Sequence, residues 1–205
     1  MSRRYTFVEL VVFMAGVATL AAEIAAQRLV APAFGASTVV WANTIAVVLL
    51  ALAGGYWLGG RLADRHPSAR GLALTALAGA ALVALIPLVA IPLLGLTEDR
   101  LNELAGSLSV VLVLVGPPVL VLGAVSPWAI RLRVQAVEDA GDVTGRLYAL
   151  STAGGLVGTF ASALLLIPLV GTRWTFLIAA ALLALAAAPG VWRRAGAPVS
   201  VEAGA

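Results

Sequence analysis

The sequence predicts an all-α integral membrane protein with six spanning helices and both termini on the cytoplasmic side. Three observations lead there: the composition, six long apolar stretches, and the positions of the arginines. Of 205 residues, 61% are hydrophobic and only 11% are charged. A soluble domain carries about a quarter charged residues, so this chain has too few charges to cover a soluble fold. We therefore expect one membrane domain across residues 1–205, with lipid as its main solvent.

The predicted helices are the apolar stretches long enough to cross the hydrocarbon of a bilayer, which takes about 20 residues. The sixth is the shortest, and it could begin earlier, with Thr172 as its N-cap. The segments between them are too short for a soluble domain. The six predicted helices are Thr6–Val30, Thr38–Gly59, Gly71–Leu94, Leu108–Ile130, Leu147–Val170 and Thr175–Ala188.

Arginine placement predicts the orientation, because cytoplasmic loops are enriched in Lys and Arg. A cytoplasmic N-terminus puts the following arginines inside: Arg3, Arg4, Arg61, Arg65, Arg70, Arg131, Arg133, Arg146, Arg193 and Arg194. It leaves Arg28, Arg100 and Arg173 outside. The all-arginine, alanine-rich composition is typical of a GC-rich genome, and we expect a multi-pass protein of a prokaryotic plasma membrane.

Two local segments also bear on this predicted topology: the N-terminus and the outer segment after the third predicted helix. Ser2, Arg3 and Arg4 before an apolar run also resemble a secretory or twin-arginine signal, but the run is too long and lacks a convincing cleavage site. In the outer segment, Thr97 followed by Glu98 and Asp99 predicts the start of a short interfacial helix.

Composition also excludes several kinds of site. The chain has no cysteine and one histidine, His66, so we expect no disulfide, no thiolate catalysis, no metal site and no cofactor. The net charge of +3 comes from arginines at the ends of apolar runs. We therefore expect the lipid bilayer, and no nucleic acid, as the partner of these charges.

Glu23 is the candidate ligand-binding residue, because a charged side chain inside a membrane costs at least about 2.5–3.5 kcal/mol and normally faces protein or water. It lies in the outer part of the first helix, on one face with Gly16, Leu20 and Gln27. It either lines a cavity and binds a cation or proton, or reaches the outer interface and pairs with an arginine. Glu9, on the same face, is interpreted as interfacial.

Small residues recur at four-residue spacing in two predicted helices and predict close helix packing. The second helix carries Ala51, Gly55 and Gly59. The fifth carries two ridges, Ser151, Gly155, Thr159 and Ala163, and Gly154, Gly158 and Ser162. The glycines at 154, 155 and 158 follow no strand, so they do not predict a phosphate-binding loop.

Pro117 and Pro118 predict a break of the fourth helix near mid-membrane, because proline removes a backbone donor and clashes with the preceding turn. Such a break either forms part of a transporter site or is a plain kink. The predicted cytoplasmic loop Gly59–His66 contains Asp64 and Arg65. These residues either couple neighbouring helix ends through an ion pair or form a solvated turn.

Four blocks resemble the membrane domain of the spermidine synthase-like family, often described as fused transporter-like/spermidine synthase proteins. They are Glu23…Gln27-Arg28-Leu29…Pro32…Phe34-Gly35…Ser37…Trp41, Gly54…Gly59-Gly60-Arg61-Leu62-Ala63-Asp64-Arg65, Pro117-Pro118…Leu122-Gly123-Ala124…Pro127, and Gly141…Gly145-Arg146-Leu147-Tyr148-Ala149…Thr152…Gly154-Gly155…Gly158-Thr159…Ile167-Pro168…Gly171. The second block also resembles the loop between helices two and three of major facilitator transporters, and six helices with both termini inside correspond to half of such a transporter.

The resemblance implies a membrane module without the soluble aminopropyltransferase domain of the fused proteins. These 205 residues include no Gly-rich loop and acidic residues of that domain, and no nucleophile–base pair is visible, so we expect no enzymatic activity. We expect the module to bind or transport a small molecule, with a polyamine-like cation as the case that the family suggests. The candidate ligand-binding residues are Glu23, Gln27, Trp41, Asn43, Tyr148 and Ser151.

The alternative is a structural subunit that anchors a separately encoded soluble enzyme or other membrane chains. The missing catalytic domain and the small-residue ridges motivate it, because such ridges also serve interfaces between subunits. A homodimer is the simplest symmetric assembly. A membrane-embedded enzyme ranks last.

Overall fold

The computed structural model describes residues 2–97 and 100–192, and the side chains from Thr6 onward. All the regular structure in these residues is helical, which confirms the all-α part of the predicted fold class. The helices are α1 (Ser2–Phe34), α2 (Thr38–Arg65), α3 (Ala69–Thr97), α4 (Glu103–Leu114), α5 (Gly116–Gly123), α6 (Val125–Arg133), α7 (Ala140–Phe160), α8 (Ile167–Val170) and α9 (Thr172–Ala187).

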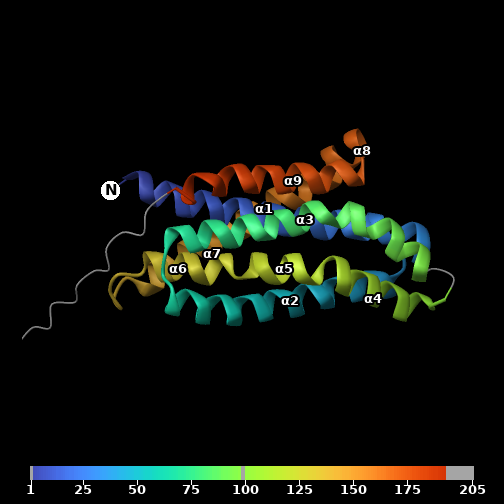
Figure 1. Ribbon diagram of the computed structural model, residues 1–205, viewed down its shortest axis with the longest axis horizontal. Helices are drawn as coiled ribbons and strands as arrows, with labels where there is room; N and C mark the ends of the chain where they lie inside the picture. Colours follow the sequence, from blue (N-terminus) through green and yellow to red (C-terminus); the bar gives the residue numbers. More distant parts are fainter. Residues whose placement is uncertain (1, 98–99, 193–205) are drawn as a thin grey trace, which may run out of the picture.

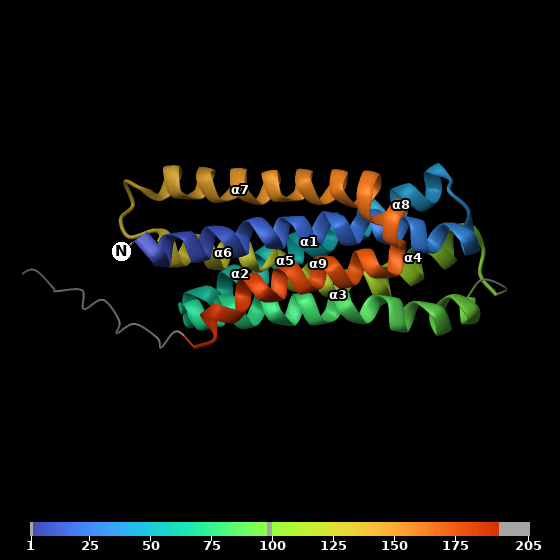
Figure 2. The ribbon, with the colours of Figure 1, turned by 90° about the horizontal axis from the view of Figure 1, so that it is seen from above.

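The helices lie side by side along the long axis of the molecule (Figure 1). Within the described residues, five helical segments are long and apolar enough to cross a membrane, and α4 together with α5–α6 makes a sixth if that bent pair is one span. These segments correspond to the six predicted stretches. In Figure 2, α7 runs along one edge beside α1, and α3 runs along the other.

The turns between helices follow from local capping. Gly35 ends α1 at φ 83°, a left-handed conformation that glycine adopts without strain. Ser37 then caps α2, its hydroxyl accepting hydrogen bonds from the Val39 and Val40 amides. Gly171, at φ 85°, makes the turn from α8 into α9. Helix α9 begins at Thr172, close to the earlier of the two predicted starts, but its N-cap is Gly171 and not Thr172.

The outer segment differs from the prediction. Helix α3 continues to Thr97, whose hydroxyl donates to the Leu93 and Leu94 carbonyls instead of capping a new helix. The next helix begins at Glu103, and Asn102 caps it through the Ala105 amide at 2.9 Å. The apolar run of α3 keeps that helix going, so the prediction of a helix starting at Thr97 was wrong. Glu98 and Asp99 lie outside the described residues.

Prolines interrupt two of the spans. The span that contains α4 bends by 46° where α4 ends at Leu114 and α5 begins at Gly116, because Pro117 and Pro118 cannot donate to the preceding turn. After α7, the chain widens into a π-helical turn over Ala161–Leu166. Pro168 cannot donate to the carbonyl of Leu164, which accounts for this local widening.

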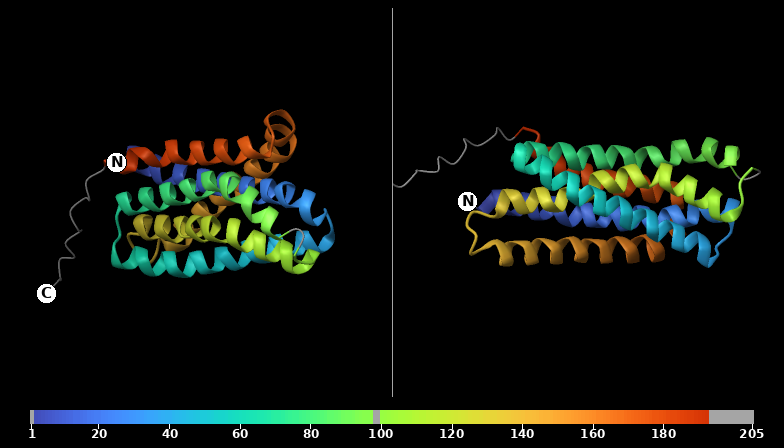
Figure 3. Two further views of the ribbon diagram at one scale, coloured as in Figure 1. Left: turned by 45° about the vertical axis from the view of Figure 1, so that its right-hand side comes forward. Right: turned by 90° about the horizontal axis from the view of Figure 1, so that it is seen from below.

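The arginines gather at one end of the bundle, where the N-terminus, the α2–α3 turn and the α6–α7 turn lie (Figures 1 and 3). We call it the arginine-rich end, defined by Arg61, Arg65, Arg70, Arg131, Arg133 and Arg146. The opposite end carries Arg28, Arg100 and Arg173. Arg193 and Arg194, and the side chains of Arg3 and Arg4, lie outside the described part.

Candidate functional site

A half-open cavity of about 200 Å³ lies between four helical segments of the bundle, and Tyr56 and Tyr148 of its lining are 40% and 44% exposed. Its walls come from α1, α2, the α5–α6 region and α7, and neither α3 nor α9 contributes. The lining residues are Ala15, Gly16, Thr19, Leu20, Leu52, Tyr56, Leu122, Gly123, Ser126, Tyr148, Ser151, Thr152 and Gly155.

Glycine contacts join the helices on one side of the cavity into the α1–α7 pair. A Cβ added at Gly154 would overlap the carbonyl oxygen of Phe13, and one at Gly158 would overlap that of Val17. In the other direction, a Cβ at Gly16 would overlap the Ser151 carbonyl. The two backbones therefore approach closely only because these positions lack side chains, which confirms the predicted packing role of the fifth-helix glycines.

Similar contacts on the other side form the α2–α5 pair. A Cβ at Gly55 would overlap the Leu120 carbonyl, and Gly123 lies close to Gly55 and to the backbone of Leu52. A Cβ at Gly59 would overlap Ala124, just before α6. The cavity thus lies between two tightly packed helix pairs, and glycines of both pairs line it.

Hydroxyl groups dominate the polar part of the lining. They belong to Thr19, Tyr56, Ser126, Tyr148, Ser151 and Thr152. The Thr19 hydroxyl donates to the Ala15 carbonyl at 2.8 Å, and a hydroxyl that donates one hydrogen bond can still accept others. Pro127 lacks the N–H that would bond the Gly123 carbonyl, which leaves an additional acceptor near the lining. The cavity can therefore offer both donors and acceptors.

The structure brings two of the six candidate ligand-binding residues, Tyr148 and Ser151, to this cavity. Glu23 is half-buried and lies one helical turn beyond Thr19 and Leu20, towards the opposite end. Gln27, also half-buried, lies one turn further. In the part of the chain that the structure describes, Glu23 forms no hydrogen bond or ion pair, including with Arg28, Arg100 or Arg173.

The other two candidates lie away from the cavity. Asn43 is buried, and its amide donates to the Leu104 carbonyl at 3.0 Å and to the Ser107 hydroxyl at 2.8 Å. These bonds tie α2 to α4 near the opposite end. Trp41 is 53% exposed, one turn from the start of α2. Asn43 therefore has a packing contact in this structure, and Trp41 lies on the outer surface.

The helix break also lies outside the lining. Pro118 is buried and Pro117 is exposed, and they begin α5 without reaching the cavity. The cavity wall of this span comes instead from Leu122, Gly123 and Ser126, at the junction of α5 and α6. The proline break sets the direction of the α5–α6 segment, and this segment forms the wall.

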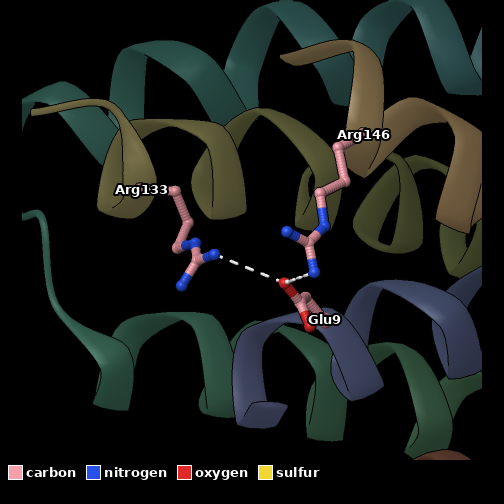
Figure 4. Close-up of polar contacts among 3 residues, drawn as sticks. All are labelled: Glu9, Arg133 and Arg146. Atoms are coloured by element: carbon pink, nitrogen blue, oxygen red, sulfur yellow. Dashed lines mark hydrogen bonds and ion pairs between the residues drawn. The ribbon is translucent and has the colours of Figure 1, made fainter. Parts of the chain in front are cut away.

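An ion-pair cluster at the arginine-rich end links α1 to α6 and α7 (Figure 4). The Glu9 Oε1 atom is 3.0 Å from Arg146 Nη2 and 3.3 Å from Arg133 Nη2. The side chains of Glu9 and Arg133 are only 20% and 12% exposed. This role of Glu9 was not predicted from the sequence. The available signal was its position two turns before Gly16, on the face of α1 that packs against α7.

Asp64 forms a second link, in which its Oδ1 lies 2.9 Å from Arg131 Nε and joins α2 to α6. The predicted loop position of Asp64 and Arg65 was wrong, because α2 continues through Arg65 and both residues lie in its last turn. The side chains of Asp64 and Arg131 are 69% and 49% exposed, so the link is a surface contact between helix ends.

Among the described residues, no cluster of His, Asp and Glu could hold a metal ion. Comparison with models of known families, with curated proteins and with solved structures finds no match for this chain. The geometry of the chain itself is therefore the basis for a functional proposal.

Proposed function

We propose that this chain is a non-enzymatic membrane module that binds or transports a small polar molecule in the cavity between its two helix pairs. The observation that carries the proposal is the set of hydroxyls, from four helical segments, that lines a half-open cavity in an apolar bundle. Polar groups at membrane depth normally face protein or a water-filled space. A hydrated cavity with donors and acceptors is suited to a small polar solute.

A polyamine-like cation is the solute class that the family resemblance suggests, and Glu23 is the carboxylate that would attract it. Glu23 lies one turn from the lining residues Thr19 and Leu20, and no arginine neutralises it in the described part of the chain. We place it at the mouth of the cavity, where it would meet a cation before the hydroxyls do.

The size of the cavity limits the solute. Its volume of about 200 Å³ is below the roughly 300–1,000 Å³ of drug-sized ligand pockets. A short, flexible cation fits this limit better than a nucleotide or a sugar chain.

The proposed topology has six spans, with the arginine-rich end and both termini in the cytoplasm of a prokaryotic cell. The excess of arginine at that end supports it. The four cavity-lining spans are the first, second, fourth and fifth in chain order, with α3 and α9 outside them. In this proposal the chain corresponds to half of a major facilitator transporter.

Uptake into liposomes tests the proposal. Purified protein is reconstituted, and entry of radiolabelled putrescine and spermidine is compared with entry into protein-free liposomes. We expect faster uptake with the wild type. Glu23→Gln should lower the uptake rate by about tenfold or more, because hydrogen bonds to charged groups contribute about 1.5–3 kcal/mol. Tyr148→Phe, which removes one neutral hydroxyl, should lower it by about threefold to tenfold.

Glu138→Gln is the matched control, because Glu138 is exposed between α6 and α7 and lies outside the cavity lining. It should take up both polyamines at the wild-type rate. If no polyamine enters faster than into protein-free liposomes, the cation-handling proposal fails.

A second candidate function is a structural subunit, and the exposure of α7 favours it. Only 22% of the apolar window of the Ala140–Val170 span is buried, against 56% for the span in α1. A second copy of this chain, another membrane chain or a soluble enzyme would be its partner. Purification in mild detergent tests this function: a defined dimer or a stoichiometric complex supports it, and a monodisperse monomer contradicts it.

A further inference from the structure

The ion pairs at the arginine-rich end join the same four spans that line the cavity. Glu9 and Arg146 are paired within the α1–α7 pair, at 3.0 Å. Asp64 and Arg131 connect α2 to α6, on the other side of the cavity. Only the contact of Glu9 with Arg133, at 3.3 Å, crosses from one side to the other among the ion pairs of the described residues.

Polar contacts at the opposite end are arranged differently. There Asn43 bonds to Leu104 and Ser107, and Ser37 bonds to Glu103, so each contact joins α2 to α4 on the same side of the cavity. Between the two sides, the contact at this end is apolar, with the Phe34 ring of α1 lying against Gly106 of α4. Apolar contacts are non-directional and can slide, whereas an ion pair fixes two atoms at a defined distance.

The chemistry of the cluster allows the crossing contact to break while the carboxylate stays paired. Arg133 and Arg146 approach the same oxygen of Glu9 (Figure 4). When Arg133 moves away with α6, Arg146 still neutralises Glu9 within the α1–α7 pair. The penalty of leaving a partly buried carboxylate unpaired is thereby avoided.

We infer that the contact between Glu9 and Arg133 is a gate that closes the arginine-rich side of the cavity. While the contact holds, the α1–α7 pair is fixed against α6 and the cavity is shut towards that end. When it breaks, the α1–α7 pair and the α2–α5 pair move apart at this end as rigid units. The apolar contacts at the opposite end act as the hinge, and the cavity opens to the cytoplasm. The gate rests on the proposed function, because it uses the same cavity and the same orientation.

Cysteine labelling tests the gate directly, because the chain has no native cysteine. Ser151→Cys places a thiol of nearly the same size in the cavity lining. Its reaction with a membrane-impermeant methanethiosulfonate reagent is followed in inside-out vesicles, where the reagent meets the cytoplasmic side. Adding Glu9→Gln or Arg133→Gln should raise the labelling rate at least tenfold over Ser151→Cys alone.

Arg131→Gln is the matched control, because Arg131 lies on the same helix two residues from Arg133 and its partner Asp64 is on its own side of the cavity. It should leave the labelling rate unchanged. Arg133→Lys, which keeps a positive charge opposite Glu9 and adds no like charge beside Arg146, should hold the rate near the starting value, provided that the protein elutes as a folded species in detergent. An unchanged rate in Glu9→Gln and Arg133→Gln overturns the gate. An equal rise in Arg131→Gln also overturns it, since the effect would then be general loosening.

Labelling needs no transported solute, so this result is separable from the uptake assay. Gated labelling without polyamine uptake would reject the proposed solute and keep the gate. Polyamine uptake together with a labelling rate that Glu9→Gln and Arg133→Gln leave unchanged would keep the proposed solute and reject the gate.

Discussion

The two sides of the bundle differ in the residues that they place at membrane depth. The α3–α9 side is apolar along its length: between Gly71 and Leu96, helix α3 has a single polar side chain, Thr75. The exposed large side chains of α3 are leucine, valine and isoleucine, and α9 also exposes Trp174 near its start. The cavity side, built by α1, α2, α5–α6 and α7, carries the hydroxyl groups of the lining and the carboxylates of Glu9 and Glu23.

In the proposed function, this difference separates a surface that contacts lipid from one that binds a polar solute. Lipid gives no reason to keep hydroxyls and carboxylates in a span, because each costs free energy to insert. The hydroxyls line one cavity and the carboxylates lie on the same side of the bundle, which supports the proposal that water or a solute reaches that side. Three substitution experiments test this difference between the two sides.

The largest expected effect is that of an arginine placed on each side. Ala81 is exposed near the middle of α3, and Ala81→Arg should disfavour membrane insertion by about 2.5–3.5 kcal/mol. Thr152→Arg, on the cavity side, should cost clearly less, because the guanidinium can reach water. The glycosylation-based insertion efficiency of each helix in the full chain measures both. Equal penalties would mean that the cavity side is as dry as the lipid side.

A smaller effect is expected from the helix pairs that flank the cavity. Gly154→Ala should lower the free energy of unfolding in detergent by about 1–3 kcal/mol, because its Cβ has no room against the Phe13 backbone. Gly145→Ala is the control on the same helix, where an added Cβ meets nothing within 4 Å. It should be neutral or slightly stabilising. Equal free energies of unfolding for the two variants would contradict close contact between α1 and α7.

The smallest effect is expected at the surface link between α2 and α6. Asp64→Asn should change the free energy of unfolding by about 0–1 kcal/mol, because the pair is exposed and salt screens it. Glu9→Gln should cost more, since Glu9 and Arg133 are mostly withdrawn from water. Denaturant titration of both variants at low and high salt compares them. If Asp64→Asn lost more free energy of unfolding than Glu9→Gln, the Asp64–Arg131 pair would be the stronger link, contrary to this prediction.

The fold could be predicted largely because membrane thickness sets the helix length. The apolar stretches, the proline break and the glycine packing are all local patterns, and each corresponds to an observed element. The boundaries were less predictable: α2 continues through Arg65, since an arginine at a helix end is compatible with both helix and loop. Thr97 ends a helix because the apolar run before it outweighs its capping tendency.

The candidate site was less predictable, because the cavity depends on which helices are neighbours. Glu23 and Gln27 are prominent in the sequence through their insertion cost, yet they lie beyond the lining, whereas Tyr148 and Ser151 belong to it. Tyr56 and Ser126 were not selected, since a tyrosine or serine in an apolar helix is common and only spatial convergence with other hydroxyls distinguishes it. The partners of Glu9 are more than a hundred residues away in sequence, and no local pattern indicates them.

Water access at two neighbouring positions of α7 decides whether the cavity between the helix pairs is aqueous. Thr152 lines the cavity, and the adjacent Ala153 is exposed outside it at nearly the same depth. With the protein in vesicles open to reagent from both sides, Thr152→Cys should react with a charged methanethiosulfonate reagent and Ala153→Cys should stay unreacted. Equal protection of both thiols would show that no aqueous cavity exists between the helix pairs, and the account would be contradicted.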